Sequence, residues 1–231
     1  MKTLAEIESV LRAFEKKTGI AAIGAQQGSG AWLVMKLGVL SASNIHRITG
    51  KPGNQTRETF LYEIVSEVCT GVAEEMNFKQ MDWGKAHEDA ARASYEFASG
   101  KNIVQVPFVF KDENFREGCS PDGLVGTRTG AEIKCPWDST NYIKFLVADR
   151  IKPEWEWQAQ FCMRVLDADS WDFCQYDPRM KTKPLHIVVV PRDLEKQKFL
   201  DDAVPAFLSD MDAMLKRLGV SFGMQWENVK L

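Results

Sequence analysis

Residues 119–136 read CSPDGLVGTRTGAEIKCP, and this stretch decides how the rest of the chain can be arranged. Asp122 lies in a Pro-Asp-Gly turn that opens a short apolar run, and a second turn leads into a strand expected over 131–135. Side chains alternate between the faces of a strand, so Glu132 and Lys134 should share one face. If the two segments form a hairpin, Asp122 comes beside Glu132. Two oxygen donors near an ammonium group make a site suited to Mg²⁺ and an attacked phosphodiester.

Each half of this pattern also has a common structural explanation. An aspartate in Pro-Asp-Gly usually serves the turn, and a Glu-x-Lys strand is usually a solvated edge of a sheet. Short motifs of this kind are weak evidence when taken singly. The residues alone therefore leave two interpretations open, a metal-dependent site and an ordinary hairpin.

The composition is that of a soluble globular protein. A chain of 231 residues, 45% hydrophobic and 26% charged, is long enough for one well-buried core. No apolar run approaches the length of a membrane span, and the charged N-terminus argues against a signal peptide. The five cysteines have no C-x-x-C spacing, which favours reduced thiols in a cytosolic protein. The net charge of −3 excludes a uniformly basic surface and leaves room for a local DNA-binding groove.

Apolar periodicity and turn residues predict one α/β domain over residues 1–231. Helices are expected at 2–18, 57–70, 79–99, 138–148 and 154–167, with a long helical stretch over 193–218 that is kinked or split at Pro205. Besides the hairpin, strands are expected at 103–110, 171–176 and 185–190. The segment 20–31 is rich in glycine and is expected to be a loop.

A further carboxylate, Glu88, lies on the helix expected at 79–99. Gly84 and Ala91 are its neighbours on the same helix face, so that face has little bulk. Such a helix can approach the core closely and bring Glu88 to a buried acidic cluster. A solvated glutamate on a charged helix is the commoner alternative.

Two features suggest contacts with phosphate. Ser43 lies in the first turn of a short helix expected at 41–49, where free N–H groups and the helix dipole favour an anion, and Lys36 could face the same spot. The loop 177–184 carries three positive charges in five residues. A capping serine, a solvated lysine and a solvated loop are the alternatives.

The order of these elements resembles the PD-(D/E)xK nuclease core, a restriction-endonuclease-like α/β fold with a central mixed β-sheet flanked by helices. Pro121-Asp122 and Glu132-Ile133-Lys134 fit its motif without gaps. Over residues 31–226 the chain is similar to the phage lambda exonuclease family, and the N-terminal helix and loop of residues 1–30 match least. The similarity rests on AWLVMKLGVLSAS, EVCTGVA, WGKAHEDAAR, CSPDGL, EIKCP, the Gln-Ala-Gln stretch near 160, YDPRMK and FGMQW.

The resemblance implies a hydrolase, a Mg²⁺-dependent 5′→3′ exonuclease. Such an enzyme degrades one strand of double-stranded DNA from its end to mononucleotides and leaves a 3′ overhang for recombination by strand annealing. It implies two Mg²⁺ ions per site, with Mn²⁺ as a possible substitute, held by Asp122, Glu132, the carbonyl of Ile133 and Glu88. Lys134 would position or deprotonate the attacking water.

The resemblance also implies a set of DNA contacts. A pocket for the terminal 5′-phosphate maps onto Lys36, Ser43, Ser120 and Gln160. Trp32 matches an aromatic residue that wedges into the DNA end, and Trp157 stands where the lambda enzyme has a tyrosine. Lys36 replaces an arginine, which exchanges a bidentate fork for a point charge, so a weaker preference for phosphorylated ends is expected.

The same resemblance implies a homotrimeric ring around DNA and a single-strand-annealing recombinase as partner. It also implies a phage or prophage gene whose product acts in the cytoplasm of a bacterial host. Two other functions remain as alternatives. One is an endonuclease of the same fold that is structure-specific or cuts internally, and the other is a protein that binds DNA ends without cleaving them.

Overall fold

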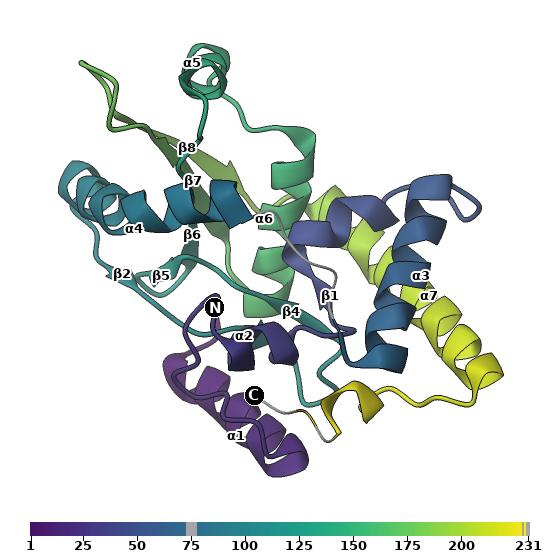
Figure 1. The fold of residues 1–231 in the computed structure, drawn as a ribbon. Helices are drawn as coiled ribbons and strands as arrows, with labels where there is room; N and C mark the ends of the chain where they lie inside the picture. Colours follow the sequence, from purple (N-terminus) through teal and green to yellow (C-terminus); the bar gives the residue numbers. More distant parts are fainter. Residues whose placement is uncertain (73–77, 228, 230–231) are drawn as a thin grey trace.

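The computed structural model of the chain describes residues 1–72, 78–227 and 229, and within this range it describes the backbone alone at 78–82 and 85. The predicted α/β class is confirmed: a five-stranded mixed sheet is flanked by helices (Figure 1). In spatial order its strands are β2 (Ile103–Val104), β5 (Gly123–Val125), β6 (Thr129–Lys134), β7 (Ser170–Tyr176) and β8 (Leu185–Pro191).

The predicted hairpin is the centre of this sheet. β5 pairs antiparallel with β6, and Gly123 lies opposite Ala131. The N–H of Asp122 donates to the carbonyl of Ala131 at 3.1 Å, so the pairing extends to the residue before β5. This register places Asp122 across from Glu132, as the spacing of the two turns predicts.

β6 and β7 run parallel, and parallel neighbours need a long crossover. The crossover consists of α5 (Ser139–Ala148) and α6 (Pro153–Leu166). A hairpin then leads from β7 to β8, which is antiparallel.

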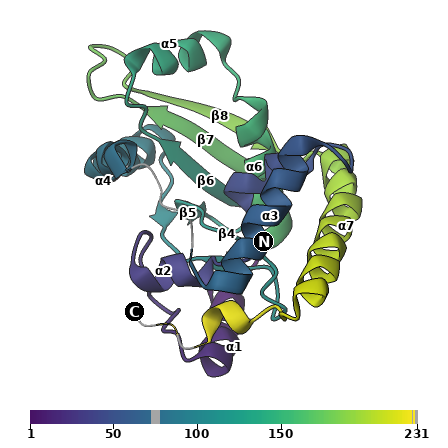
Figure 2. The same ribbon diagram turned by 45° about the vertical axis from the view of Figure 1, so that its right-hand side comes forward.

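Helices cover both faces of the sheet. α4 (Phe78–Ser99) packs on one face, where Ala91 and Tyr95 form a buried cluster with Ala131 and Ile133. α6 packs on the other face, so the sheet lies between the two helices (Figure 2). Because side chains alternate along β6, the α6 face receives Glu132.

A second sheet and a helical layer complete the structure. The three-stranded sheet has the order β1–β4–β3, formed by Leu40–Ser41, Glu117–Cys119 and Val109–Phe110. Phe110 of β3 packs against α1 (Leu4–Thr18), where the Phe14 ring lies 4.9 Å from Phe110 and also 4.9 Å from Trp226. The remaining helices are α2 (Gly30–Met35), the 3₁₀ helix η1 (Ala42–Ile48), α3 (Gln55–Thr70), α7 (Leu194–Leu218) and the 3₁₀ helix η2 (Met224–Trp226).

Three of the expected elements differ in detail from the structure. The strand expected at 103–110 is divided into β2 and β3, which belong to different sheets. Pro107 lies between them and has no N–H for a central ladder. Pro205 lies inside α7, which runs without a break from Leu194 to Leu218, so the helix is not split there; residues on both sides of Pro205, including Val204 and Phe207, are buried. The glycine-rich loop, expected to extend to residue 31, ends at Ser29, which is the N-cap of α2.

None of the helices in the described part of the chain has the length and apolar content needed to cross a membrane.

Candidate active site

Two carboxylates meet where β5 begins and β6 ends. The N–H of Ile133 donates to Asp122 Oδ2 at 2.6 Å, which holds this carboxylate against β6. The Lys134 ammonium donates to Glu132 Oε1, and Gln158 Nε2 on α6 donates to the same oxygen at 2.9 Å. Glu132 is only 4% exposed, so its interactions are almost entirely with other residues.

Burial and the neighbouring charges change the ionisation of Asp122. Burial raises the pKa of Asp122 to about 8, and the negative charges of Glu132 and then Glu88 act in the same direction. Burial by itself would lower the pKa of Lys134, but the charges of Glu132 and Asp122 outweigh it and hold the pKa above its ordinary value. Lys134 is therefore a cation at neutral pH. This charge state suits stabilisation of a phosphate better than removal of a proton from water.

The donor set fits a hard divalent cation. Glu132 Oε2 is buried and has no hydrogen-bond partner within the described residues. A cation next to it would satisfy this oxygen and offset the repulsion between the two carboxylates. Within the same part of the chain, no three His, Cys, Asp or Glu side chains are grouped closely enough to hold a metal by themselves. Mg²⁺ tolerates such a sparse set, because it usually keeps several waters and takes substrate phosphate oxygens as ligands.

Glu88 faces the same site from α4. It lines a cavity of about 430 Å³ together with Asp122 and Lys134. Arg92 lies one helical turn further on, with its guanidinium 3.2 Å from Glu88 Oε1. Gly84 borders the cavity and Ala91 is fully buried against the sheet, so small residues do bring this face of α4 close to β6.

Helix α2 supplies the next group of predicted residues. Trp32 is 7% exposed and lines the cavity, and its indole N–H donates to Ser120 Oγ at 2.8 Å. The Lys36 ammonium lies 3.8 Å above the Trp32 ring. Lys36, Ser41 and Ser43 line a neighbouring cavity of about 310 Å³. Burial lowers the pKa of Lys36 to about 8, although the charge of Glu67 opposes this shift.

Comparison with known proteins identifies the family. Residues 31–169 match the family model described as the YqaJ-like viral recombinase domain. The chain belongs to this family. A curated relative, the putative uncharacterized protein ExoD of Escherichia coli (strain K12), is 41% identical over 78 residues, which are 34% of this chain and 90% of ExoD.

Two solved structures similar to this YqaJ-family chain are described as exonucleases. The alkaline exonuclease LHK-Exo from Laribacter hongkongensis is 29% identical, with a TM-score of 0.76 over 83% of this chain and 96% of that one. A phage related exonuclease from Haemophilus somnus 129PT is 16% identical, with a TM-score of 0.63 over 78% and 96%, and shows the shared fold alone. The predicted relationship to the lambda exonuclease family and the predicted restriction-endonuclease-like fold are confirmed.

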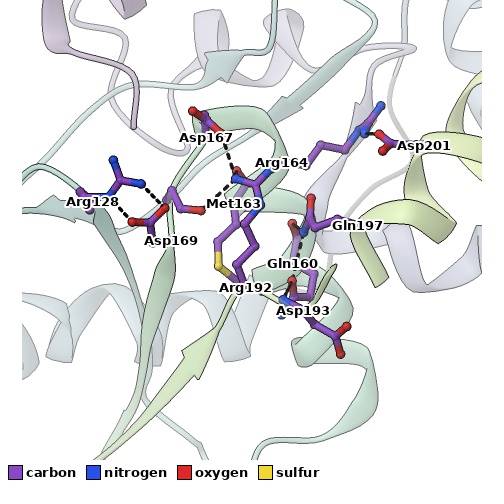
Figure 3. Close-up of polar contacts among 11 residues, drawn as sticks. Arg128, Gln160, Met163, Arg164, Asp167, Asp169, Arg192, Asp193, Gln197 and Asp201 are labelled. Atoms are coloured by element: carbon purple, nitrogen blue, oxygen red, sulfur yellow. Dashed lines mark hydrogen bonds and ion pairs between the residues drawn. The ribbon is translucent and has the colours of Figure 1, made fainter. Parts of the chain in front are cut away.

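Two residues of the YqaJ-family chain that were predicted to contact DNA, Gln160 and Trp157, face α7 and do not line the cavity of Asp122 and Lys134. Gln160 is 1% exposed and faces α7, where its Oε1 accepts from Asp193 N–H and Gln197 Nε2 (Figure 3). Its Nε2 donates to the carbonyl of Pro191 at the end of β8. Trp157 also packs towards α7, with its ring 5.3 Å from Phe199. All the polar atoms of the Gln160 side chain are occupied, so this geometry does not support its assignment to a phosphate pocket.

Gln158 is the residue of the Gln-Ala-Gln stretch that reaches the site. An α-helix turns by 100° per residue, so side chains two positions apart point to nearly opposite sides. Gln158 therefore faces Glu132 while Gln160 faces α7. The sequence pattern did not distinguish them, because both are glutamines and only the packing of α6 between β6 and α7 decides which one faces the sheet.

Proposed function

We propose that this chain is a Mg²⁺-dependent 5′→3′ exonuclease, a single nuclease domain that degrades one strand of double-stranded DNA from its end to mononucleotides. The product would carry a 3′ overhang for recombination by strand annealing. One observation supports this most strongly: Glu88, Asp122 and Lys134 line one cavity, with Glu132 paired to Lys134. It occurs in a viral recombinase family, on a fold shared with an alkaline exonuclease.

In this proposal the acidic residues hold the metal and the other residues orient them. Asp122, Glu132, Glu88 and the Ile133 carbonyl would hold two Mg²⁺ ions, or Mn²⁺ as a substitute, which when bound supply an activated water and offset charge on the leaving oxygen. The N–H of Ile133 holds Asp122, and Gln158 holds Glu132. Lys134 keeps its positive charge and stabilises the negative charge that develops on the phosphate.

The second cavity supports the proposed 5′ polarity. Lys36 and Ser43 line it, and the Lys36 ammonium lies over Trp32, which lines the catalytic cavity. A terminal 5′-phosphate bound by Lys36 would therefore lie next to the hydrolytic site. Its recognition by a lysine gives charge attraction without a bidentate fork.

This contact can be tested with Lys36→Ala. We expect it to weaken binding of 5′-phosphorylated ends by about 1.5–3 kcal/mol, the range for a hydrogen bond to a charged group, and to change binding of 5′-hydroxyl ends little. Titration of both kinds of duplex end, with Ca²⁺ in place of Mg²⁺ to prevent hydrolysis, measures the difference. An equal loss on both ends would show that Lys36 contacts another phosphate.

We further propose that the protein acts as a homotrimeric ring in the cytoplasm of a bacterial host, encoded by a phage or prophage, beside a single-strand-annealing recombinase. The support is membership of a viral recombinase family. A ring explains retention on DNA despite a net charge of −3, because a closed ring does not depend on tight binding.

The decisive experiment is digestion of linear duplex DNA labelled at the 5′ or the 3′ end, with Mg²⁺ or with EDTA, beside a covalently closed circle. The proposal predicts immediate Mg²⁺-dependent release of the 5′ label as a mononucleotide, with the circle intact. Early loss of the 3′ label would reverse the polarity, and cutting of the circle would indicate an endonuclease. No digestion under any condition would favour a protein that only binds DNA ends.

A further inference from the structure

An exposed tryptophan follows the catalytic strand. Trp137 comes three residues after Lys134, and 59% of its surface is exposed. Single exposed apolar residues are common and need no explanation by themselves. Trp137 differs from such residues because the backbone that carries it and one side of its ring are both held in place.

Arg179 holds this backbone. Its guanidinium donates to the carbonyl of Pro136 at 3.0 Å and to that of Trp137 at 2.9 Å. The same guanidinium is paired at 2.8 Å with Asp177, which is completely buried. The charged loop 177–184 is thus bound to the end of the catalytic strand, so Arg179 is a positioning residue for the segment after Lys134.

Trp83 on α4 supports the ring. The rings of Trp83 and Trp137 meet edge to face, with centroids 5.3 Å apart and planes at 81°. Trp83 in turn packs on His87 at 3.9 Å, and the Arg179 guanidinium lies 4.7 Å from its ring centre. This edge-to-face contact covers only part of the Trp137 ring, and the rest of the ring is exposed to solvent.

This aromatic cluster borders the catalytic cavity. Gly84, the neighbour of Trp83, and Cys135, two residues before Trp137, both line that cavity. A strand with a phosphate at Asp122 and Lys134 therefore passes next to the exposed tryptophan. A fixed aromatic surface stacks on any base, which suits an enzyme that must digest every sequence.

We propose that Trp137 is a stacking platform for the nucleobase beside the scissile phosphate of the hydrolysed strand, held in position by Arg179 and Trp83. The proposal rests on the proposed function, because it takes the hydrolysed strand as the ligand. It assigns to Trp137 a contact with substrate that is independent of metal binding.

The test is a double-mutant cycle between the protein and the DNA. Wild type, Trp137→Ala and Trp137→Phe are titrated with duplex ends in Ca²⁺, which prevents hydrolysis. One duplex is intact, and in the other the first two nucleotides of the 5′ strand are abasic. We expect Trp137→Ala to weaken binding of the intact end roughly 5- to 150-fold, the range for loss of one base–aromatic stack, and binding of the abasic end less than twofold. Trp137→Phe should retain most of the affinity.

Phe97→Ala is the matched control. Phe97 is 93% exposed on the same helix as Glu88, nine residues further along, which is about 13 Å at 1.5 Å per residue. Its loss should not change either affinity. Equal weakening of intact and abasic ends by Trp137→Ala would overturn the stacking proposal, and so would a change in oligomeric state that accounts for the loss. Digestion of linear DNA by the wild type, measured in parallel with Mg²⁺, tests the proposed function separately.

Discussion

At the scale of single residues, Glu132 connects most of the site. One of its oxygens accepts from both Lys134 and Gln158, and the other is buried without a partner in the described part of the chain. A buried carboxylate oxygen without a donor is costly unless a cation or proton occupies that position. The side chain is thus prepared for a ligand that the protein does not itself supply.

The first prediction concerns this carboxylate and its lysine. Glu132→Gln keeps the size of the side chain and removes its charge, and Lys134→Ala removes the cation. We expect either change to lower digestion of linear duplex DNA by about 100-fold or more, the effect of losing one group that stabilises transition-state charge. End binding should be largely kept. Glu154→Gln, a surface glutamate on α6, is the control, and processive digestion by either site variant would refute the assignment.

The second prediction concerns pH and Mg²⁺. The pKa of Asp122 is about 8 in the folded, metal-free protein and near 3.8 in the unfolded chain. Between these values the folded state binds the extra proton, so stability should fall as pH rises from about 4 to 8. Mg²⁺ binds the ionised form, so it should raise the melting temperature more at about pH 9 than at about pH 6.

Asp122→Asn should abolish both effects, since the amide does not titrate. Thermal denaturation with Mg²⁺ and with EDTA at the two pH values measures them. A shift by Mg²⁺ that is the same at both pH values would show that Asp122 is not the group that controls binding.

At the scale of elements, α6 serves the active site and the core with opposite faces. Gln158 lies against Glu132, while Gln160 joins the helix to Pro191, Asp193 and Gln197. Two glutamines that differ by two positions therefore have different functions. The helix can hold the Glu132 carboxylate in place because its other face is fixed to α7.

The third prediction separates these functions. Gln160→Ala leaves several buried groups without partners, at about 1–3 kcal/mol each, and should lower the free energy of unfolding by about 3 kcal/mol. Gln158→Ala should cost less than about 1 kcal/mol of stability and reduce turnover by about tenfold. Urea denaturation and digestion rates of both variants, below their melting temperatures, give the comparison. A loss of turnover confined to Gln160→Ala would reverse the assignment.

At the scale of the whole molecule, a protein with a net charge of −3 must hold a polyanion. The acidic site is local, formed where β5 begins and β6 ends with Glu88 on α4, and the cations Lys36, Arg92 and Arg179 lie on neighbouring segments. In the proposed function, local charge and not net charge would decide where DNA binds.

The fourth prediction concerns assembly. If the proposed ring is correct, sedimentation equilibrium should give three times the chain mass of 26.1 kDa. Digestion begun before addition of an excess of unlabelled duplex should continue on the first substrate, because a closed ring does not dissociate readily. A monomer that exchanges freely onto the competitor would rule out the ring and leave the chemistry of the site unaffected.

The sequence by itself was sufficient for the catalytic hairpin and most helices. Alternation along β6 put Glu132 and Lys134 on one face, and the spacing of two turns placed Asp122 opposite them. Helices end at Gly19 and Gly71 in the left-handed conformation, as the glycines predict. These features depend on neighbours close in the chain, so local rules are enough to predict them.

Only the tertiary structure decided the rest. Whether Gln158 or Gln160 faces Glu132 depends on which side of α6 the sheet covers. The strand expected at 103–110 is divided because its first part pairs in the five-stranded sheet and its last part in the three-stranded sheet. The helix α7 continues through Pro205, with buried residues on both sides of the proline. The high pKa of Asp122 likewise comes from desolvation and from a carboxylate ten positions away. Burial and contacts between distant segments are properties of the packed molecule, so no local pattern contains them.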